Sequence, residues 1–177
     1  IHVSKDGGAT WNIISGNLPQ NRWISRVVAS AHKKERVYVT LNGYRNDDFT
    51  TYVYMSDDFG QTWINIATNL PTSPVNVLVE DNVNEDVLYL GTDNGLYVSL
   101  NKGSLWNDFS NGIPNVAVHD LVIQKKAKDL VVGTHGRSIY KVNLEPVQQL
   151  NEKVLAENLH VFEIKKIKKS KEWGNNW

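Results

Sequence analysis

Short apolar runs separated by polar turns recur along this chain in a fixed order. Each unit has a first run rich in β-branched and aromatic residues, a polar turn, a second run, a glycine-containing turn and a third run. Alternation such as Val37-Val39 or Leu88-Leu90 predicts β-strands that are buried on at least one face. The first runs cover residues 23–29, 75–79 and 118–123, the second runs 36–40, 87–92 and 130–134, and the third runs 52–56, 96–99 and 138–142.

An eight-residue motif, Ser-x-Asp-x-Gly-x-Thr-Trp, accompanies these units. It occurs twice, beginning at Ser4 and Ser56, and a third copy with Asn and Leu replacing Asp and Thr begins at Ser99. The repeat length of about 40–50 residues is that of propeller blades and related arrays. The motif positions are Ser4, Asp6, Gly8, Thr10 and Trp11; Ser56, Asp58, Gly60, Thr62 and Trp63; and Ser99, Asn101, Gly103 and Trp106.

The chemistry of the motif predicts a tight turn with a structural role. Asp6, Asp58 and Asn101 can accept hydrogen bonds from nearby backbone N–H groups, and the glycines can adopt positive φ. We therefore expect these three side chains to point into their own turns. The tryptophan that ends each copy offers a large apolar surface, so we expect all three indoles to be largely buried.

Four short antiparallel strands per unit, with no helix between them, predict a propeller blade. The fold class is therefore all-β, with residues 1–144 forming half a blade, two whole blades and most of a fourth. A complete propeller needs roughly twice this length, so we interpret the chain as part of a parent with six to eight blades. The remaining blades, or a second copy, are the expected partners of its open edges.

The motif and its setting resemble the Asp-box, or BNR, repeat of sialidases, xyloglucan-type glucanases and sortilin-type receptors. Residues 91–97 and 133–140 resemble more closely the sortilin-like secreted bacterial proteins labelled "glycosyl hydrolase, BNR repeat". The resemblance implies a blade periphery built from the motif, and a secreted, periplasmic or cell-surface bacterial location. It does not by itself imply enzymatic activity.

The segment after residue 144 departs from the repeat. Pro146 and an apolar stripe at Val147, Leu150, Val154 and Leu155 predict one helix over about residues 147–157. Residues 160–164 can form a closing strand, which makes 145–165 a second segment. Residues 166–177 are rich in lysine and indicate a solvated linker or tail, with an anionic-partner site as the alternative.

The composition of the chain argues against several classes of function. The chain of 177 residues has 19 basic and 19 acidic residues, so its net charge gives no basis for binding nucleic acid. It has no cysteine, which excludes thiol catalysis and thiolate metal sites. No stretch approaches the roughly 20 apolar residues of a membrane span. The five histidines show no metal-ligand spacing, and we expect neither a metal nor a cofactor.

Candidate ligand contacts lie on the loops that join second to third strands, because such loops carry binding residues on rigid scaffolds. All these loops should share one face of the propeller. The alternative is that they are ordinary hairpins, with His135 and Arg137 merely flanking a turn at Gly136. The candidates are Tyr44, Arg45, Asp47, Asp93, His135 and Arg137.

Two functions are compatible with these features. The first is a non-catalytic propeller module that recognises a protein, peptide or glycan within a larger exported protein. The alternative is part of a glycoside hydrolase, which needs paired carboxylates or, in sialidases, a Tyr nucleophile and an arginine cluster. Asp47, Asp48, Asp93 and Asp120 are available carboxylates, but no spacing pairs any two of them. We favour recognition and assign no catalytic residue.

Overall fold

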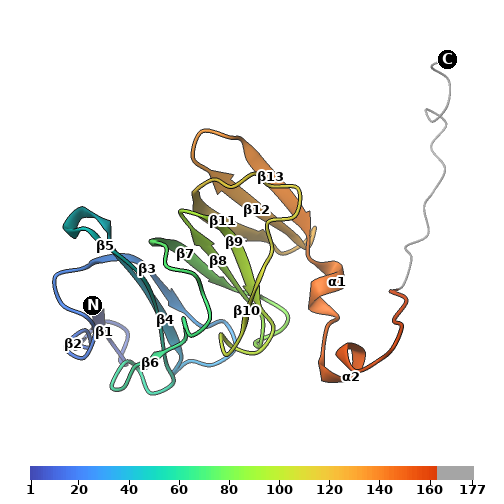
Figure 1. The fold of residues 1–177 in the computed structure, drawn as a ribbon. Helices are drawn as coiled ribbons and strands as arrows, with labels where there is room; N and C mark the ends of the chain where they lie inside the picture. Colours follow the sequence, from blue (N-terminus) through green and yellow to red (C-terminus); the bar gives the residue numbers. More distant parts are fainter. Residues whose placement is uncertain (163–177) are drawn as a thin grey trace, which may run out of the picture.

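A computed structural model describes residues 1–162. Four antiparallel sheets stand side by side around a common axis (Figure 1). The two-stranded sheet contains β1 (His2–Val3) and β2 (Asn12–Ile13). The next contains β3 (Trp23–Ala29), β4 (Val37–Gly43), β5 (Asp48–Ser56) and β6 (Ile64–Asn65). The third contains β7 (Val75–Glu80), β8 (Leu88–Thr92), β9 (Gly95–Ser99) and β10 (Trp106–Asp108), and the fourth β11 (Val118–Gln124), β12 (Asp129–Thr134) and β13 (Ile139–Asn143).

This arrangement confirms the predicted all-β partial propeller. Strand order within each sheet follows the sequence, and the first strand of each larger sheet lies innermost, where β7 contacts both β3 and β11. In chain order, the structure thus contains half a blade, two complete four-stranded blades and one three-stranded blade.

The hydrophobic core lies between blades. One cluster joins the third and fourth sheets, a second joins the sheets of β3–β6 and β7–β10, and a smaller third lies around Leu18, Val39 and Leu41. The β7–β10 blade is flanked on both sides, so all five residues of β8 are buried. β3 and β13 have no such cover on one face, and their residues are all exposed or half-buried.

The repeated motif forms the turn between third and fourth strands. The Asp58 carboxylate accepts hydrogen bonds from the Thr62 backbone N–H at 2.9 Å and the Thr62 hydroxyl at 2.6 Å, while the Gly60 N–H donates to Ser56 Oγ at 2.8 Å. Asp6 makes the equivalent bonds. Asn101 Oδ1 keeps the backbone bond, from Leu105 N at 2.8 Å. All three side chains therefore point into their own turns, as the sequence predicts.

The tryptophans of the motif differ in burial, which corrects the expectation that all three are largely buried. Trp106 is 4% exposed and Trp63 is half-buried, but Trp11 is 62% exposed. Each of the first two donates its indole N–H to a carbonyl of the preceding sheet: Trp63 to Ile14 at 2.8 Å and Trp106 to Ile66 at 2.7 Å. Trp11 has no preceding sheet beside it in the described residues and donates within its own turn, to Gly8 O at 3.1 Å.

The C-terminal segment contains two one-turn helices, α1 (Glu145–Gln148) and α2 (Glu152–Leu155), where the sequence predicted one longer helix. The Asn151 side chain accepts a hydrogen bond from Val154 N at 3.0 Å, which caps a new helix start and interrupts the first. Residues 160–162 are not in a strand, and the rest of the predicted closing strand, like the basic segment 166–177, lies outside the described residues.

The stretch 41–51, which lies between the predicted second and third runs, is mostly strand. β4 continues to Gly43 and β5 begins at Asp48, leaving a single 3-10 turn, η1 (Tyr44–Asn46). Asp47 closes that turn in the left-handed conformation, with φ 55°. Among the described residues, no helix has the length and apolar character needed to cross a membrane.

Candidate functional site

The turns between second and third strands occupy one end of the sheets. They follow β4, β8 and β12, and because every blade has the same strand order they point the same way. The turns after β4 and β12 lie along the upper side of the molecule in Figure 1. Two of the turns are tied to the residue before the first strand of their blade, by Asp93 N to Pro74 O at 3.1 Å and His135 N to Ala117 O at 2.9 Å.

An exposed aromatic platform lies at the first of these turns. Trp23 is 62% exposed and Tyr44 is 49% exposed. The Arg45 guanidinium lies over both rings, 5.2 Å from the Trp23 centroid and 5.8 Å from the Tyr44 centroid. Its Nε donates to Tyr44 Oη at 3.2 Å. Trp23, Tyr44 and Arg45 are called the Trp23 platform below.

A half-buried ion pair holds this platform in place. Arg22 Nε and Nη2 each lie 2.6 Å from Asp48 Oδ2, and the Tyr52 hydroxyl donates to the same oxygen at 2.7 Å. Hydrogen bonds from Thr50 and Tyr52, together with Arg22, hold the pKa of Asp48 well below its ordinary value. The pair therefore remains charged at any ordinary pH and joins the start of β3 to the start of β5.

Each innermost strand carries a β-bulge at the same position. The pairing skips Ser25 in β3, Asn76 in β7 and His119 in β11. Bulges redirect side chains and are frequent beside binding and active sites. Asn76 Nδ2 donates to Asp93 Oδ1 at 2.8 Å, and Ser25 Oγ lies 2.8 Å from Thr40 Oγ1. The His119 ring packs against His135 with centroids 5.0 Å apart.

The structure brings only some of the predicted site residues into contact with one another. Tyr44 and Arg45 form the Trp23 platform, and Asp47 ends its turn. Asp93 and His135 instead contact the bulge residues of their own blades, Asn76 and His119. The Arg137 carbonyl accepts a hydrogen bond from the Tyr140 hydroxyl at 3.2 Å. Within residues 1–162, no hydrogen bond or ion pair joins the three turns, so the six candidates do not form one cluster.

An ion pair spans the innermost strands. Arg26 Nη2 lies 2.5 Å from Asp120 Oδ1, which connects β3 to β11 across β7. Arg26 Nε is buried without a partner in the described structure. Asp120, one of the carboxylates available for catalysis by sequence, is therefore engaged in holding two blades together.

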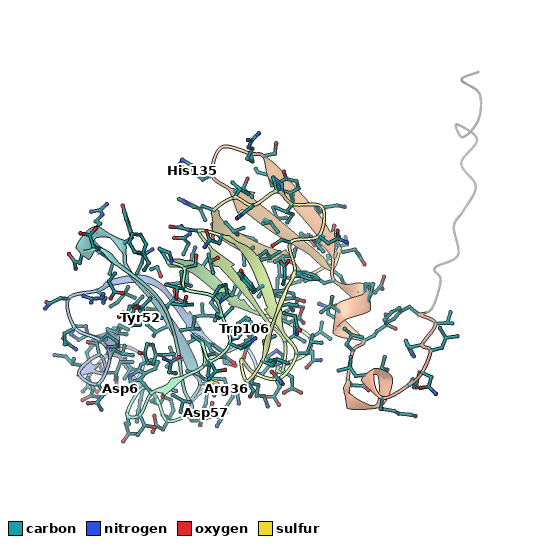
Figure 2. The ribbon with its side chains drawn as sticks, in the orientation of Figure 1. Asp6, Arg36, Tyr52, Asp57, Trp106 and His135 are labelled. Atoms are coloured by element: carbon teal, nitrogen blue, oxygen red, sulfur yellow. The ribbon has the colours of Figure 1, made fainter. Side chains whose placement is uncertain are left out.

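A second charged network lies at the opposite end of the blades. The Arg36 side chain is buried, and its Nε donates to Asp57 Oδ1 at 2.6 Å and its Nη1 to Glu85 Oε2 at 2.9 Å. Asp57 raises the pKa of Arg36, and Arg36 lowers that of Asp57. Figure 2 shows Arg36 and Asp57 at the end of the molecule away from His135. Glu80, also buried, accepts from Ser30 and from the Tyr38 hydroxyl, so this network clamps neighbouring blades.

Several of these residues cannot be recognised from the sequence pattern. The pattern places Trp23 in a strand, where the structure has it, but does not predict that its side chain is exposed. It also predicts ordinary strands at the three bulge positions. A signal was present for the bulges, because Ser25, Asn76 and His119 each interrupt an apolar run near its start. The sequence contains no comparable signal for the pairing of Arg22 with Asp48 or of Arg36 with Asp57, because both pairs depend on contacts between separate strands. No group of three or more possible metal ligands occurs in the described part of the chain.

No protein-family model and no curated protein sequence matches the chain. Several solved structures are similar to it in fold. A GH74 enzyme of Niastella koreensis superposes on 68% of the chain with TM-score 0.56 and 23% identity. The GH74 xyloglucanase of Xanthomonas campestris superposes on 70% with TM-score 0.53 and 16% identity, and an ancestral GH74 enzyme on 79% with TM-score 0.58 and 17% identity.

The chain covers 21% of each of these three structures. At such low identity the similarity establishes the fold and does not transfer an activity. The described chain is thus a partial β-propeller whose blades resemble those of glycoside hydrolases of the GH74 type.

Proposed function

We propose that the chain is part of a non-catalytic propeller module that recognises a ligand through the end carrying the turns after β4, β8 and β12. The observation that carries this proposal is the Trp23 platform. Large aromatic rings left in contact with water, and held rigid from beneath by a charged pair, are typical of recognition surfaces. The ligand classes are those expected from sequence: a glycan, a peptide or a protein.

The environment of the carboxylates supports recognition over hydrolysis. A glycoside hydrolase requires two carboxyl groups about 5–10 Å apart on either side of the scissile bond. Of the four aspartates named as available, Asp48 is paired with Arg22, Asp120 is paired with Arg26, and Asp93 accepts from Asn76. Of these four, only Asp47 has a side chain that makes neither a hydrogen bond nor an ion pair with a residue of the described chain.

The resemblance to Asp-box and sortilin-like proteins supports a role as one segment of a larger exported bacterial protein. In that role the repeated motif stabilises the blade periphery, and the ligand contacts lie at the turns. The remaining blades of the parent cover the edges of β1–β2 and β13.

A second function is favoured by the structural similarity. The solved structures that share the fold are GH74 enzymes, one of them a xyloglucanase. In this alternative the chain supplies part of the substrate-binding surface of a glycoside hydrolase, and catalytic carboxylates come from other blades.

One experiment separates the two. The full-length parent and the 177-residue chain are each incubated with chromogenic glycosides, including xyloglucan oligosaccharides, and tested in parallel for retention on immobilised glycans and peptides. We expect retention without turnover by both, and retention lost in Trp23→Ala. Turnover by the parent would replace recognition by hydrolysis.

A further inference from the structure

We propose that the Trp23 platform binds a saccharide that carries a carboxylate, such as the uronic acid residues of an acidic glycan. This inference rests on the proposed recognition function and names the chemical class of its ligand.

Arg45 supplies the site for the carboxylate. Among residues 1–162 no carboxylate pairs with Arg45, and the one hydrogen bond its guanidinium makes there is from Nε to Tyr44 Oη. A guanidinium has five N–H donors, and two of them on one edge match the two oxygens of a carboxylate. The charge of Arg45 is therefore free to bind an anion, while the two rings beneath it fix its position.

Trp23 supplies the surface for the sugar ring. A pyranose has an apolar face of C–H groups and a polar edge of hydroxyls, and a flat aromatic ring buries that face at little cost in side-chain entropy. Arg45 covers part of each ring, and the remaining exposed surface of Trp23 and Tyr44 provides the contact area for the sugar. Asp47 follows in the same turn, exposed to solvent, and its carboxylate can accept hydrogen bonds from sugar hydroxyls.

The platform is rigid before any ligand binds. The Arg22–Asp48 pair joins the starts of β3 and β5. Asn46 Nδ2 donates to Asn21 O at 2.9 Å, which connects η1 to the segment that precedes β3. Gly43 leaves room for Arg22, since a Cβ at that position would lie 2.8 Å from Arg22 Cδ. A surface ordered in advance loses less entropy on binding.

A glycan fits this surface better than a peptide or a nucleic acid. A peptide side chain that anchors a complex is usually held in an enclosed, fully desolvated pocket, whereas the Trp23 platform is open. A nucleic acid is recognised through many phosphates, whereas the chain has zero net charge.

The test compares an oligogalacturonate with its neutral methyl ester, by titration calorimetry on the 177-residue chain. We expect the acid to bind about tenfold more tightly, the gain of a charge-assisted hydrogen bond. Arg45→Gln should abolish the preference for the acid over the ester, and Trp23→Ala should weaken binding of both. Lys34→Gln, which removes an exposed cation from the turn between β3 and β4 at the opposite end of the blade, should change neither.

The failure of this inference is distinguishable from that of the proposed function. Equal affinity for acid and ester, still sensitive to Trp23→Ala, would overturn the carboxylate assignment and leave glycan recognition standing. Stronger binding of a peptide with a free C-terminal carboxylate, or of a single-stranded oligonucleotide, would overturn the ligand class. Circular dichroism of each variant ensures that a lost signal reflects the surface and not the fold.

Discussion

At the scale of single residues, the repeated motif works by saturating one carboxylate with hydrogen bonds. Asp6 is exposed and Asp58 is partly exposed, yet bonds from Thr10 and Thr62 lower their pKa to about 2. Asn101 retains one oxygen acceptor and cannot gain or lose a charge. The chain therefore contains, in its third copy, a natural neutral version of the same turn.

This difference predicts a pH effect. The pKa of Asp58 in the folded protein, about 2, lies below its ordinary value of 3.8. Its contribution to stability is therefore fully present above about pH 4 and is lost as the pH falls toward 2. Asp58→Asn should be less stable than the unmodified chain at neutral pH but should lose less stability on acidification.

The measurement is the midpoint of thermal unfolding between about pH 6 and pH 2.5. Lys34→Gln, at an exposed position, serves as the control for a change of one charge. Parallel pH profiles for the unmodified chain and Asp58→Asn would mean that the turn hydrogen bonds do not depend on the carboxylate charge.

At the scale of elements, the second and third motifs are each also one half of a joint between blades. The glycine of a motif lies against an isoleucine of the preceding blade: a Cβ on Gly103 would come within 2.7 Å of Ile66 Cδ1 and 2.9 Å of Ile66 Cβ. The tryptophan that follows donates to the carbonyl of the same isoleucine. Asn69 completes the joint, with hydrogen bonds of 2.8 and 2.9 Å to the backbone of Trp106.

The joint predicts that the same glycine-to-alanine substitution lowers the free energy of unfolding by different amounts in different copies of the motif. Gly8 and Gly103 both have positive φ, 97° and 84°, so an alanine is strained at either site. Only Gly103 faces a neighbouring blade, whereas a Cβ on Gly8 would meet its nearest atom, in Trp11, at 3.8 Å. Gly103→Ala should therefore cost about 1–3 kcal/mol more than Gly8→Ala, the usual penalty for overpacking.

Urea unfolding followed by circular dichroism measures both variants against the unmodified chain. Similar losses for the two alanine variants would show that backbone strain alone determines the effect and that the blades can separate enough to admit a methyl group.

The sequence predicts those features that are local to an element. Strand order followed from apolar runs, and the bonds of Asp58 followed from the spacing of the motif. The exposure of Trp11 could not be predicted from its motif, which is the same as that of Trp63, because burial depends on whether another blade lies beside it. The Trp23 platform and the Arg36 network likewise depend on contacts between distant segments, and the break at Asn151 arises from one side-chain cap that competes with helix continuation.

At the scale of the whole molecule, stability should be graded from the centre outward. β8 is buried throughout, while both residues of β2 are exposed. Segments with few buried contacts open more often than the central core.

Hydrogen exchange followed by mass spectrometry should therefore find the slowest amides in β7–β9 and the fastest in β1, β2 and α2. Ligand-free and ligand-bound samples can be compared in the same experiment, with protection at η1 expected for a bound acidic oligosaccharide. Uniform exchange across all four sheets would contradict the gradient and indicate a single cooperative unit.

The joints between blades also give the assembly a polarity. In the second and third motifs the tryptophan contributes the indole N–H, and the preceding blade contributes the carbonyl that accepts it. A duplicated unit would carry both halves, so it could be inserted between two existing neighbours without changing either contact. Growth of such an array by gene duplication is thereby restricted to one orientation, and the number of units is limited by the curvature at which the ring closes.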